Sequence, residues 1–228
     1  MVFVASPALG PATLRPTVDA VVHLGYDAVL VELSDLDGLP LPRWRSAAGR
    51  IASAVYGSDG PAVLVGHGQA GPLLVPVAEL RRVAGVILVD AALPPLSGEV
   101  PTLPVGLVAS AEDRIVDGRL PPWETWWPQC ALEFLVDDEE LRSTIRAELP
   151  AVPASYAEEV IPVGTRWRSL PTGYLRLSLI RESEATFAGM RGMAVERLAG
   201  DHLLTATAPE AVAQKLAVLM EALEPAMI

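Results

Sequence analysis

The chain of 228 residues is long enough for one domain with a sizeable hydrophobic core. Hydrophobic residues make up 51% of it, yet no apolar run reaches the roughly 18 residues that a membrane-spanning helix needs. The net charge of −11 argues against nucleic-acid binding, which requires clustered Lys and Arg. A single cysteine, Cys130, allows no internal disulfide and no cysteine-based metal site, and neither a metal nor a cofactor is implied.

The first residues of the chain lack the basic start of a signal peptide and are predicted to form a strand instead. We therefore expect a cytoplasmic protein that has no membrane partner. The single lysine, Lys215, beside many arginines, alanines and prolines, is typical of proteins from GC-rich bacterial genomes. The sequence leaves the oligomeric state open, a homodimer included.

Short apolar runs alternate with longer helical patterns, which is typical of a mostly parallel sheet with crossover helices on both faces. Proline at the start and glycine after the end help to delimit several of the helices. Six strands are predicted, near residues 2–6, 28–32, 62–66, 85–90, 173–179 and 193–198. The corresponding helices are predicted over residues 16–24, 42–55, 72–83, 182–190 and 209–223.

The composition changes between about residues 91 and 171, where prolines are dense and Trp123, Trp126 and Trp127 cluster. Within this block, residues 137–149 predict a helix with an acidic first turn, and residues 156–160 a shorter one. We therefore expect a core of residues 1–90 and 172–228 with an insertion of residues 91–171. The three tryptophans either line a pocket under this insertion or pack into a small core of their own.

One motif stands at the end of the third predicted strand, where Val63–Gly71 reads VLVGHGQAG. A buried strand, a sharp turn and a helix are predicted there. The pattern resembles the nucleophile elbow of the α/β-hydrolases, G-x-S-x-G, with Gly68 in the place of the serine. Glycine adopts the strained backbone of such a turn without steric cost, so the turn is expected to persist. Gly68, however, has no side chain that could attack a substrate.

The order of the remaining segments resembles the same family. The insertion falls where α/β-hydrolases carry a lid between their sixth and seventh strands, and Asp201-His202-Leu203 follows the last predicted strand. The resemblance implies an α/β-hydrolase fold that begins at the family's third strand, in a small bacterial branch that includes esterases and hydroxynitrile lyases. His202 matches the family's catalytic histidine, and it follows a strand end, where open α/β sheets bind ligands.

The acidic partner of His202 has three candidates. The resemblance implies an acid after the family's seventh strand, and Glu182 stands there in this chain. Some members place the acid at the end of the family's sixth strand instead, where Asp90 stands. Asp113 is a third candidate, because it follows an apolar run that resembles a strand. Either Glu182 or Asp90 would orient the imidazole and stabilise its protonated form, as the acid of a serine triad does.

Other polar residues near the elbow have less defined roles. His67 precedes the nucleophile position, where we expect it to pack or to form a hydrogen bond beside the elbow. His23 falls inside an amphipathic helix and is interpreted as structural. Ser6 and Ser178 lie near strand ends, but neither stands on an elbow, and we interpret both as polar filling.

The resemblance also implies an oxyanion hole built from backbone N–H groups. One N–H comes from the residue after the nucleophile, which is Gln69, and the other from the loop after the family's third strand. Pro7 has no N–H, so Ala8 or Leu9 is expected to supply the second donor. Such donors do not depend on the missing serine.

Three functions are compatible with these features. In the first, His202 acts as a general base on an apolar small metabolite in bacterial biosynthesis, giving elimination, lyase, cyclisation or isomerisation chemistry. In the second, the protein is an inactive pseudo-hydrolase that binds a ligand or a partner. In the third, His202 activates water for hydrolysis without an acyl-enzyme. A glycine introduced deliberately into an esterase is a further alternative.

Overall fold

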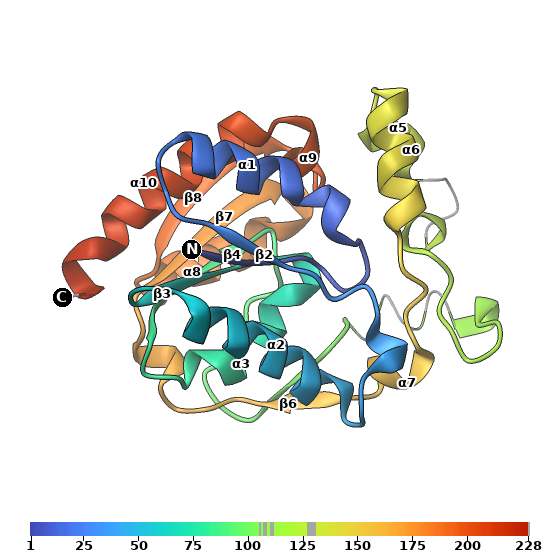
Figure 1. Cartoon of the computed structure of the whole chain (residues 1–228), viewed down its shortest axis with the longest axis horizontal. Coiled ribbons are helices and arrows are strands. Elements are labelled where there is room, and N and C mark those ends of the chain that lie inside the picture. The colour runs from blue at the N-terminus through green and yellow to red at the C-terminus, as the bar shows by residue number, and fades with distance from the viewer. Residues whose placement is uncertain (105, 107–108, 110–111, 127–130, 228) are drawn as a thin grey trace.

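The computed structural model describes residues 1–104, 106, 109, 112–126 and 131–227. Its main sheet has six strands in the order β2-β1-β3-β4-β7-β8, and all five pairings are parallel (Figure 1). The prediction of a six-stranded parallel sheet is thereby confirmed. The strands are β1 (Val2–Val4), β2 (Val29–Val31), β3 (Ala62–His67), β4 (Val83–Val89), β7 (Thr172–Ser178) and β8 (Ala194–Gly200).

Helices cover both faces of this sheet. Neighbouring side chains of a strand point to opposite faces. Accordingly, Val63 and Val65 of β3 pack in a cluster with α1 and α10, whereas Leu64 packs in another with α2, α3 and α8. The helices are α1 (Arg15–His23), α10 (Pro209–Met227), α2 (Arg43–Gly57), α3 (Gly71–Ala78) and α8 (Glu182–Met190).

Short one-turn elements connect these units, mostly as 3-10 helices. They are η1 (Pro11–Thr13), η2 (Leu36–Gly38), η3 (Gly68–Ala70), η4 (Glu112–Arg114), η5 (Trp123–Thr125), η6 (Trp167–Ser169), η7 (Leu179–Arg181) and α9 (Leu204–Thr207).

Two predicted helices differ from the structure. The helix expected over residues 72–83 ends at Ala78, because the apolar residues from Val83 onward belong to β4. The helix expected over residues 156–160 is wrong. The short helix α7 (Ala154–Ala157) ends earlier, and β6 (Val160–Pro162) pairs antiparallel with β5 (Glu99–Pro101) in a separate two-stranded sheet.

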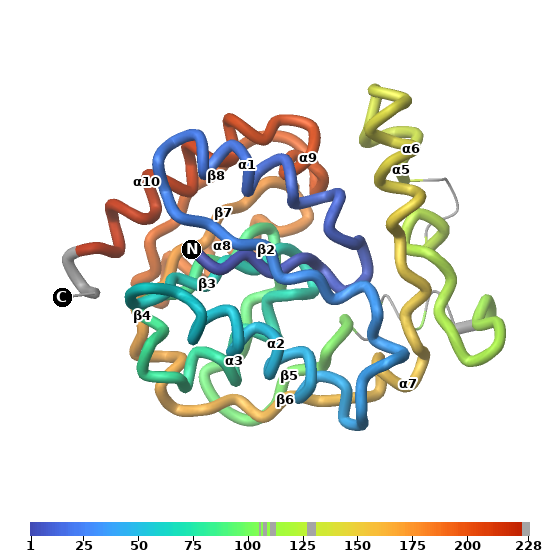
Figure 2. Tube along the Cα trace, viewed as in Figure 1, coloured from blue at the N-terminus to red at the C-terminus, as the bar shows by residue number. Residues whose placement is uncertain are grey.

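The segment between β4 and β7 carries further helices. They are α5 (Ala131–Leu135) and α6 (Glu139–Glu148), whose first turn is capped by the Asp138 side chain, which accepts a hydrogen bond from Leu141 N. Figure 2 shows α5 and α6 standing beside the layered core. Buried aromatic residues of the same segment, Tyr156 and Trp167, lie in one continuous hydrophobic cluster with Leu64. The insertion therefore packs into the main core.

Carboxylates of the insertion also fix it to the rest of the chain. Glu159 accepts hydrogen bonds from the backbone N–H groups of Arg43 and Trp44, both at 2.9 Å, at the start of α2. Glu148, at the end of α6, accepts one from Ala12 N at 2.8 Å. Because the first N–H groups of a helix have no partner within it, Glu159 satisfies donors that α2 cannot satisfy itself.

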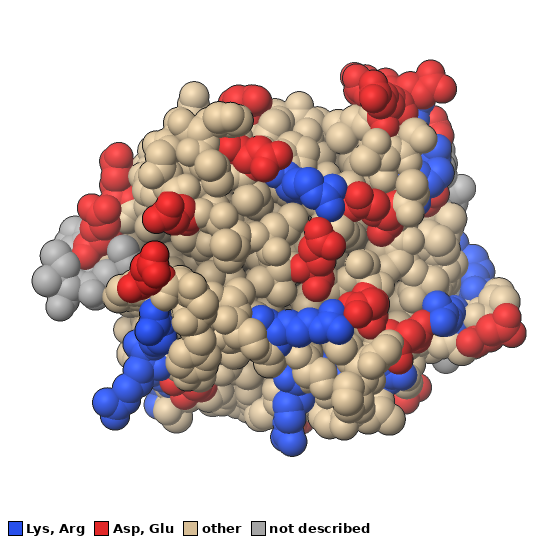
Figure 3. All heavy atoms as spheres, viewed as in Figure 1, with Lys and Arg blue, Asp and Glu red and all other residues tan. Residues whose placement is uncertain are grey.

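The surface carries the excess of negative charge in separate groups. Figure 3 shows acidic side chains gathered over α6, with arginines scattered among acidic residues elsewhere on this face. Across the described ranges, no helix combines the length and the apolar character that crossing a bilayer requires.

Candidate active site

The predicted elbow forms a tight turn between β3 and α3. Gly68 follows directly after β3 and has a φ of +55°, a left-handed conformation that costs glycine little. The flanking glycines allow close packing: a Cβ on Gly66 would lie 2.8 Å from the Leu74 side chain, and one on Gly71 would lie 3.0 Å from Ala91 Cβ. The turn between β3 and α3 thus forms with glycine at its centre.

His202 lies directly against the place where the nucleophile would stand. A Cβ built on Gly68 would be 2.9 Å from Nε2 of His202 and 3.8 Å from Oγ of Ser6. His202 belongs to the loop between β8 and α9, as the sequence predicted. The fold therefore brings the imidazole and the elbow together, although 134 positions separate Gly68 and His202 in the chain.

The carboxylate that contacts His202 is Asp90. It follows β4 directly, and its Oδ2 lies 2.7 Å from Nδ1 of His202. The other partners of this buried carboxylate are the N–H groups of Leu177 and Ser178, at 2.9 and 2.8 Å, and the Ser178 hydroxyl at 2.6 Å. Because Asp90 accepts at Oδ2, Nδ1 carries the hydrogen and Nε2 is free to accept a proton.

The electrostatics of Asp90 favour its charged form. Burial raises the pKa of this carboxyl, but the hydrogen bond and the positive charge of His202, together with the Ser178 donors, outweigh burial and hold the pKa below its usual range. Asp90 therefore stays ionised near neutral pH.

A second histidine supports the first. The rings of His67 and His202 are stacked with centroids 4.4 Å apart, and Nε2 of His67 lies 2.9 Å from the carbonyl oxygen of His202. Burial, then repulsion from His202, lowers the pKa of His67 to about 3. A neutral His67 donates its Nε2–H to that carbonyl, and Nδ1 is buried without a partner among the described residues. The expectation of packing beside the elbow agrees with this geometry.

The structure places the other acidic candidates elsewhere. Glu182 begins α8 and forms ion pairs with Arg176 and Arg197, each at 3.0 Å, so of the three candidates left open it is Asp90 and not Glu182 that contacts His202. Asp113 is exposed in η4, and most of the apolar run before it lies outside the described residues. Strand order explains the result, because β4 lies next to β3 and its end therefore lies beside the elbow.

The backbone donors are only partly as expected. Leu9 N–H donates to the carbonyl of Ser6 at 3.1 Å, which removes Leu9 as an oxyanion donor. Ala8 N–H has only a long contact of 3.4 Å to Ser6 Oγ, and Gln69 N–H lies in the first turn of η3. The Ser6 hydroxyl in turn donates to Gln69 Oε1 at 3.0 Å. Gln69 and Ala8 are the remaining candidates.

Two tryptophans of the insertion, Trp123 and Trp126, are buried, and Trp123 packs against the site. The ring of Trp123 stacks over His202 with centroids 6.3 Å apart, and Nε1 of Trp126 donates to Pro121 O at 2.7 Å. Both belong to the main hydrophobic cluster. Trp127 and Cys130 lie outside the described residues. His23, the remaining histidine, is exposed in the last turn of α1.

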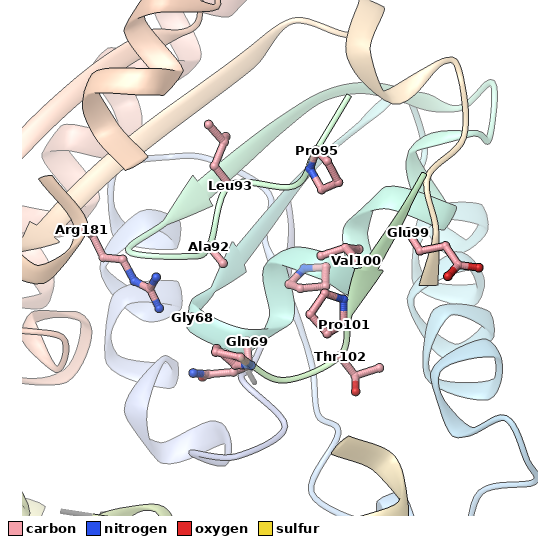
Figure 4. Close-up of a pocket in the computed structure, with 12 residues that line it drawn as sticks. Gly68, Gln69, Ala92, Leu93, Pro95, Glu99, Val100, Pro101, Thr102 and Arg181 are labelled. Atoms are coloured by element: carbon pink, nitrogen blue, oxygen red, sulfur yellow. The ribbon is translucent and has the colours of Figure 1, made fainter. Parts of the chain in front are cut away.

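A cavity of about 350 Å³ opens beside the elbow (Figure 4). Its volume is near the lower end of the range typical of small-molecule sites. Neither Trp123 nor Trp126 lines it, so packing is the alternative that describes these two side chains. Most of the lining is apolar, and the described residues that form it include Gly68, Gln69, Pro72, Ala92, Leu93, Pro95, Val100 and Pro101.

The sequence analysis did not assign a role in the site to two polar residues that lie there. Ser178, interpreted as polar filling, donates its hydroxyl to Asp90. Arg181, in η7, lines the cavity. Both lie at or just beyond the carboxyl end of β7, the end where parallel sheets bind ligands, and that position was the available signal. Among the described residues, no group of three or more His, Cys, Asp and Glu side chains is placed to hold a metal ion.

Comparisons with known proteins identify the fold. No family model matches the sequence, and no curated protein sequence matches it. Solved structures do match. An extracellular α/β-hydrolase from a Paenibacillus species, reported to share structural and functional homology with tobacco salicylic acid binding protein 2, has a TM-score of 0.72 at 16% identity, covering 96% of this chain and 98% of its own.

Two further enzymes show the same likeness. A methylesterase from Arabidopsis has a TM-score of 0.69 at 13% identity and covers 96% of this chain and 98% of its own. A pyrethroid hydrolase from Sphingobium faniae has a TM-score of 0.63 at 18% identity, with 97% of both chains covered. Together with the strand order and the elbow, these likenesses show that the chain has the α/β-hydrolase fold.

Proposed function

We propose that the protein is an enzyme in which His202 acts as a general base on a small, largely apolar molecule without forming a covalent intermediate. The observation that carries the proposal is the pairing of His202 Nδ1 with Asp90 at 2.7 Å, while Nε2 faces the glycine of the elbow. This is the acid and base part of a triad with no nucleophile. Proton transfer by a positioned side chain commonly contributes about 10² to 10⁴ in rate.

The proposed step balances without a further reactant. Nε2 of neutral His202 takes a proton from a carbon or hydroxyl of the substrate, and the electron pair moves toward an adjacent carbonyl or a leaving group. The N–H of Gln69 stabilises the oxygen that gains charge. The imidazolium then returns its proton to the leaving group in an elimination, or to another carbon in an isomerisation.

Gly68 connects the base with the cavity in this proposal. Gly68 lines the cavity, and Nε2 lies beside the position of its missing side chain. With glycine there, Nε2 reaches substrate through the space that a serine side chain would fill. The glycine at position 68 therefore accounts both for the missing nucleophile and for the access of His202 to the substrate.

Hydrolysis by water that His202 activates is the second candidate. It is favoured by the activities named for the structural relatives, a methylesterase and a pyrethroid hydrolase. In both candidate functions His202 is the base and the substrate binds in the same cavity. They differ in whether water enters the product.

The test uses two probe reactions with the full chain. Cleavage of mandelonitrile to benzaldehyde reports elimination, and hydrolysis of 4-nitrophenyl acetate reports activated water. For general-base elimination we expect the first activity in the wild type, its loss of about 10² or more in His202→Ala and Asp90→Asn, and no gain in Gly68→Ser. Glu182→Gln is the matched control, because this carboxylate does not contact His202.

The outcomes separate the candidates. Ester hydrolysis that depends on His202, shows no burst and incorporates labelled oxygen from water would favour the second candidate. Activity that His202→Ala retains in full would contradict both. Absence of both reactions, and of proton exchange at the α-carbon of small carbonyl compounds in D₂O, would leave a binding protein as the better description.

A further inference from the structure

Arg181 is the one cationic side chain among the described residues that line the cavity. It ends η7, just beyond β7, and Figure 4 shows its guanidinium reaching into the cavity toward Gly68 and Gln69. Its side chain is only 17% exposed. A guanidinium in such a position is a charge that the fold has placed against a mostly apolar wall.

The hydrogen-bonding capacity of Arg181 is only partly used. Its Nη1 donates to Glu184 Oε1 at 2.6 Å, and the other oxygen of Glu184 accepts from the Ser183 hydroxyl. In the described part of the chain, Glu184 is the only recorded hydrogen-bond partner of Arg181. A guanidinium has five N–H donors arranged to bind a carboxylate through two of them. Donors therefore remain for a ligand.

The positive charge of Arg181 also acts on a residue of the elbow. Arg181 contributes, after burial and His202, to the lowered pKa of His67. Asp90 acts on His67 in the opposite direction and more strongly than Arg181. The guanidinium therefore lies close enough to the elbow for its charge to act there.

The cavity has opposite character at its two sides. Glu99, the acidic residue of the lining, stands across the cavity from Arg181, and its carboxylate points away from the interior in Figure 4. Between them lie apolar side chains such as Leu93, Val100 and Pro101. This arrangement fits a molecule with an apolar body and one charged end.

We propose that the substrate is a small apolar carboxylate whose anionic group binds Arg181, while its apolar body lies along the wall formed by Leu93, Val100 and Pro101. The proposal rests on the proposed function in that it places the substrate in this cavity. In a chain with a net charge of −11, general electrostatics repel anions, so recognition of a carboxylate depends on this local cation. Arg181 thereby selects the substrate and presents it to His202.

The test compares two probes of the same shape, 2-naphthoate and 2-naphthamide, of which only the first is charged near pH 7. Calorimetric titration of the wild type should show naphthoate binding about tenfold or more tightly than naphthamide. Arg181→Gln should abolish this preference without weakening naphthamide binding, and Arg181→Lys should retain part of it. Arg168→Gln, which removes an exposed arginine outside the cavity lining, should leave the preference unchanged.

A second variant guards against a folding defect in Arg181→Gln. Glu184→Gln removes the negative charge that pairs with Arg181, so naphthoate should bind more tightly than to the wild type. Equal binding of the two probes by the wild type, absence of naphthoate binding at millimolar concentration, or weaker binding in Glu184→Gln would overturn the proposal.

The same titrations separate this proposal from the catalytic one. A preference for naphthoate that persists in His202→Asn assigns recognition to Arg181 whether or not His202 is a base. A preference that disappears in His202→Asn and survives in Arg181→Gln would assign the anion to the imidazolium, and the proposal for Arg181 would be wrong. Neither result depends on turnover.

Discussion

Nε2 of His202 lies 2.9 Å from the point where the Cβ of any residue other than glycine would stand at position 68. Real Cβ atoms essentially never approach a neighbour so closely, so a side chain at this position and the imidazole compete for the same space. The φ of +55° at Gly68 adds a backbone cost for other residues. The histidine thus occupies part of the volume that a nucleophile needs.

Placing a serine at position 68 should therefore be costly but informative. We expect Gly68→Ser and Gly68→Ala each to lose about 2 kcal/mol in free energy of unfolding, because both need a left-handed backbone and a shift of His202. Urea titration measures this. We also expect Gly68→Ser alone to react with a fluorophosphonate, and only slowly, since His202 must move first.

The alanine variant is the matched control for that experiment, because it has the same steric cost without a hydroxyl. A double variant, Gly68→Ser with His202→Ala, should be labelled far less. Labelling of the wild type would contradict the absence of an elbow nucleophile, and an inert Gly68→Ser would show that the dyad of Asp90 and His202 cannot activate a hydroxyl.

The substitution Asp90→Asn tests the role of the negative charge of Asp90, because it replaces the carboxylate by a neutral amide. Asparagine tolerates the positive φ of 46° at this position, so the backbone is not the cause of the effect. We expect a loss of about 3 kcal/mol in unfolding free energy, since the buried pair of the Asp90 carboxylate and the His202 imidazole loses its negative charge. The low-field proton resonance of His202 Nδ1–H should also disappear. Glu182→Gln should leave that resonance in place, and its loss there would restore Glu182 as the acid.

His67 predicts a dependence of stability on pH. Its pKa falls from 6.5 to about 3 on folding, so the unfolded chain binds a proton below pH 6.5 that the folded chain does not bind. Stability is therefore lost as the pH falls through this window. We expect the wild type to lose about 2 kcal/mol more than His67→Gln between about pH 7 and pH 5.

Urea titrations of both proteins at the two pH values give the comparison. Groups present in both, including the surface carboxylates, contribute equally and cancel in the difference. Equal losses in the wild type and His67→Gln would show that His67 can take up its proton in the folded state.

Glu159 gives a prediction about the insertion. Because it accepts two N–H groups at the start of α2, Glu159→Ala should lower the unfolding free energy by about 2 kcal/mol, and Glu158→Ala, next to it and exposed, by much less. Tryptophan fluorescence, which reports mainly the insertion, and circular dichroism, which reports the whole chain, should show coincident transitions. Separate transitions would mean that the insertion unfolds independently.

The core was predictable because its signals are local. Each strand of the main sheet is a short apolar run between turn-forming residues, and the glycines at 66, 68 and 71 mark the elbow without any knowledge of the rest of the chain. His202 was found for a similar reason, since it stands in a loop between the last strand and the last helix.

There is a physical reason why the sequence alone could not identify the carboxylate that pairs with His202. Asp90 ends one predicted strand and Glu182 follows another, and the choice between them depends on which strand end lies beside β3 and where each side chain points. Likewise, the pairing of β5 with β6 joins segments about sixty residues apart that have no alternating pattern. Arg181 was missed because a single arginine after a strand is most often solvated.

The packing of the insertion limits how a molecule can reach the cavity. Trp126, Tyr156 and Trp167 are almost fully buried in the same cluster as the strands of the main sheet. Each such aromatic buries about 200 Å², so lifting all three away would cost roughly 15 kcal/mol at about 25 cal/mol per Å². That is as much as the entire stability of many domains. The insertion therefore does not lift away as a unit, and these aromatic residues remain in place while a molecule enters or leaves the cavity.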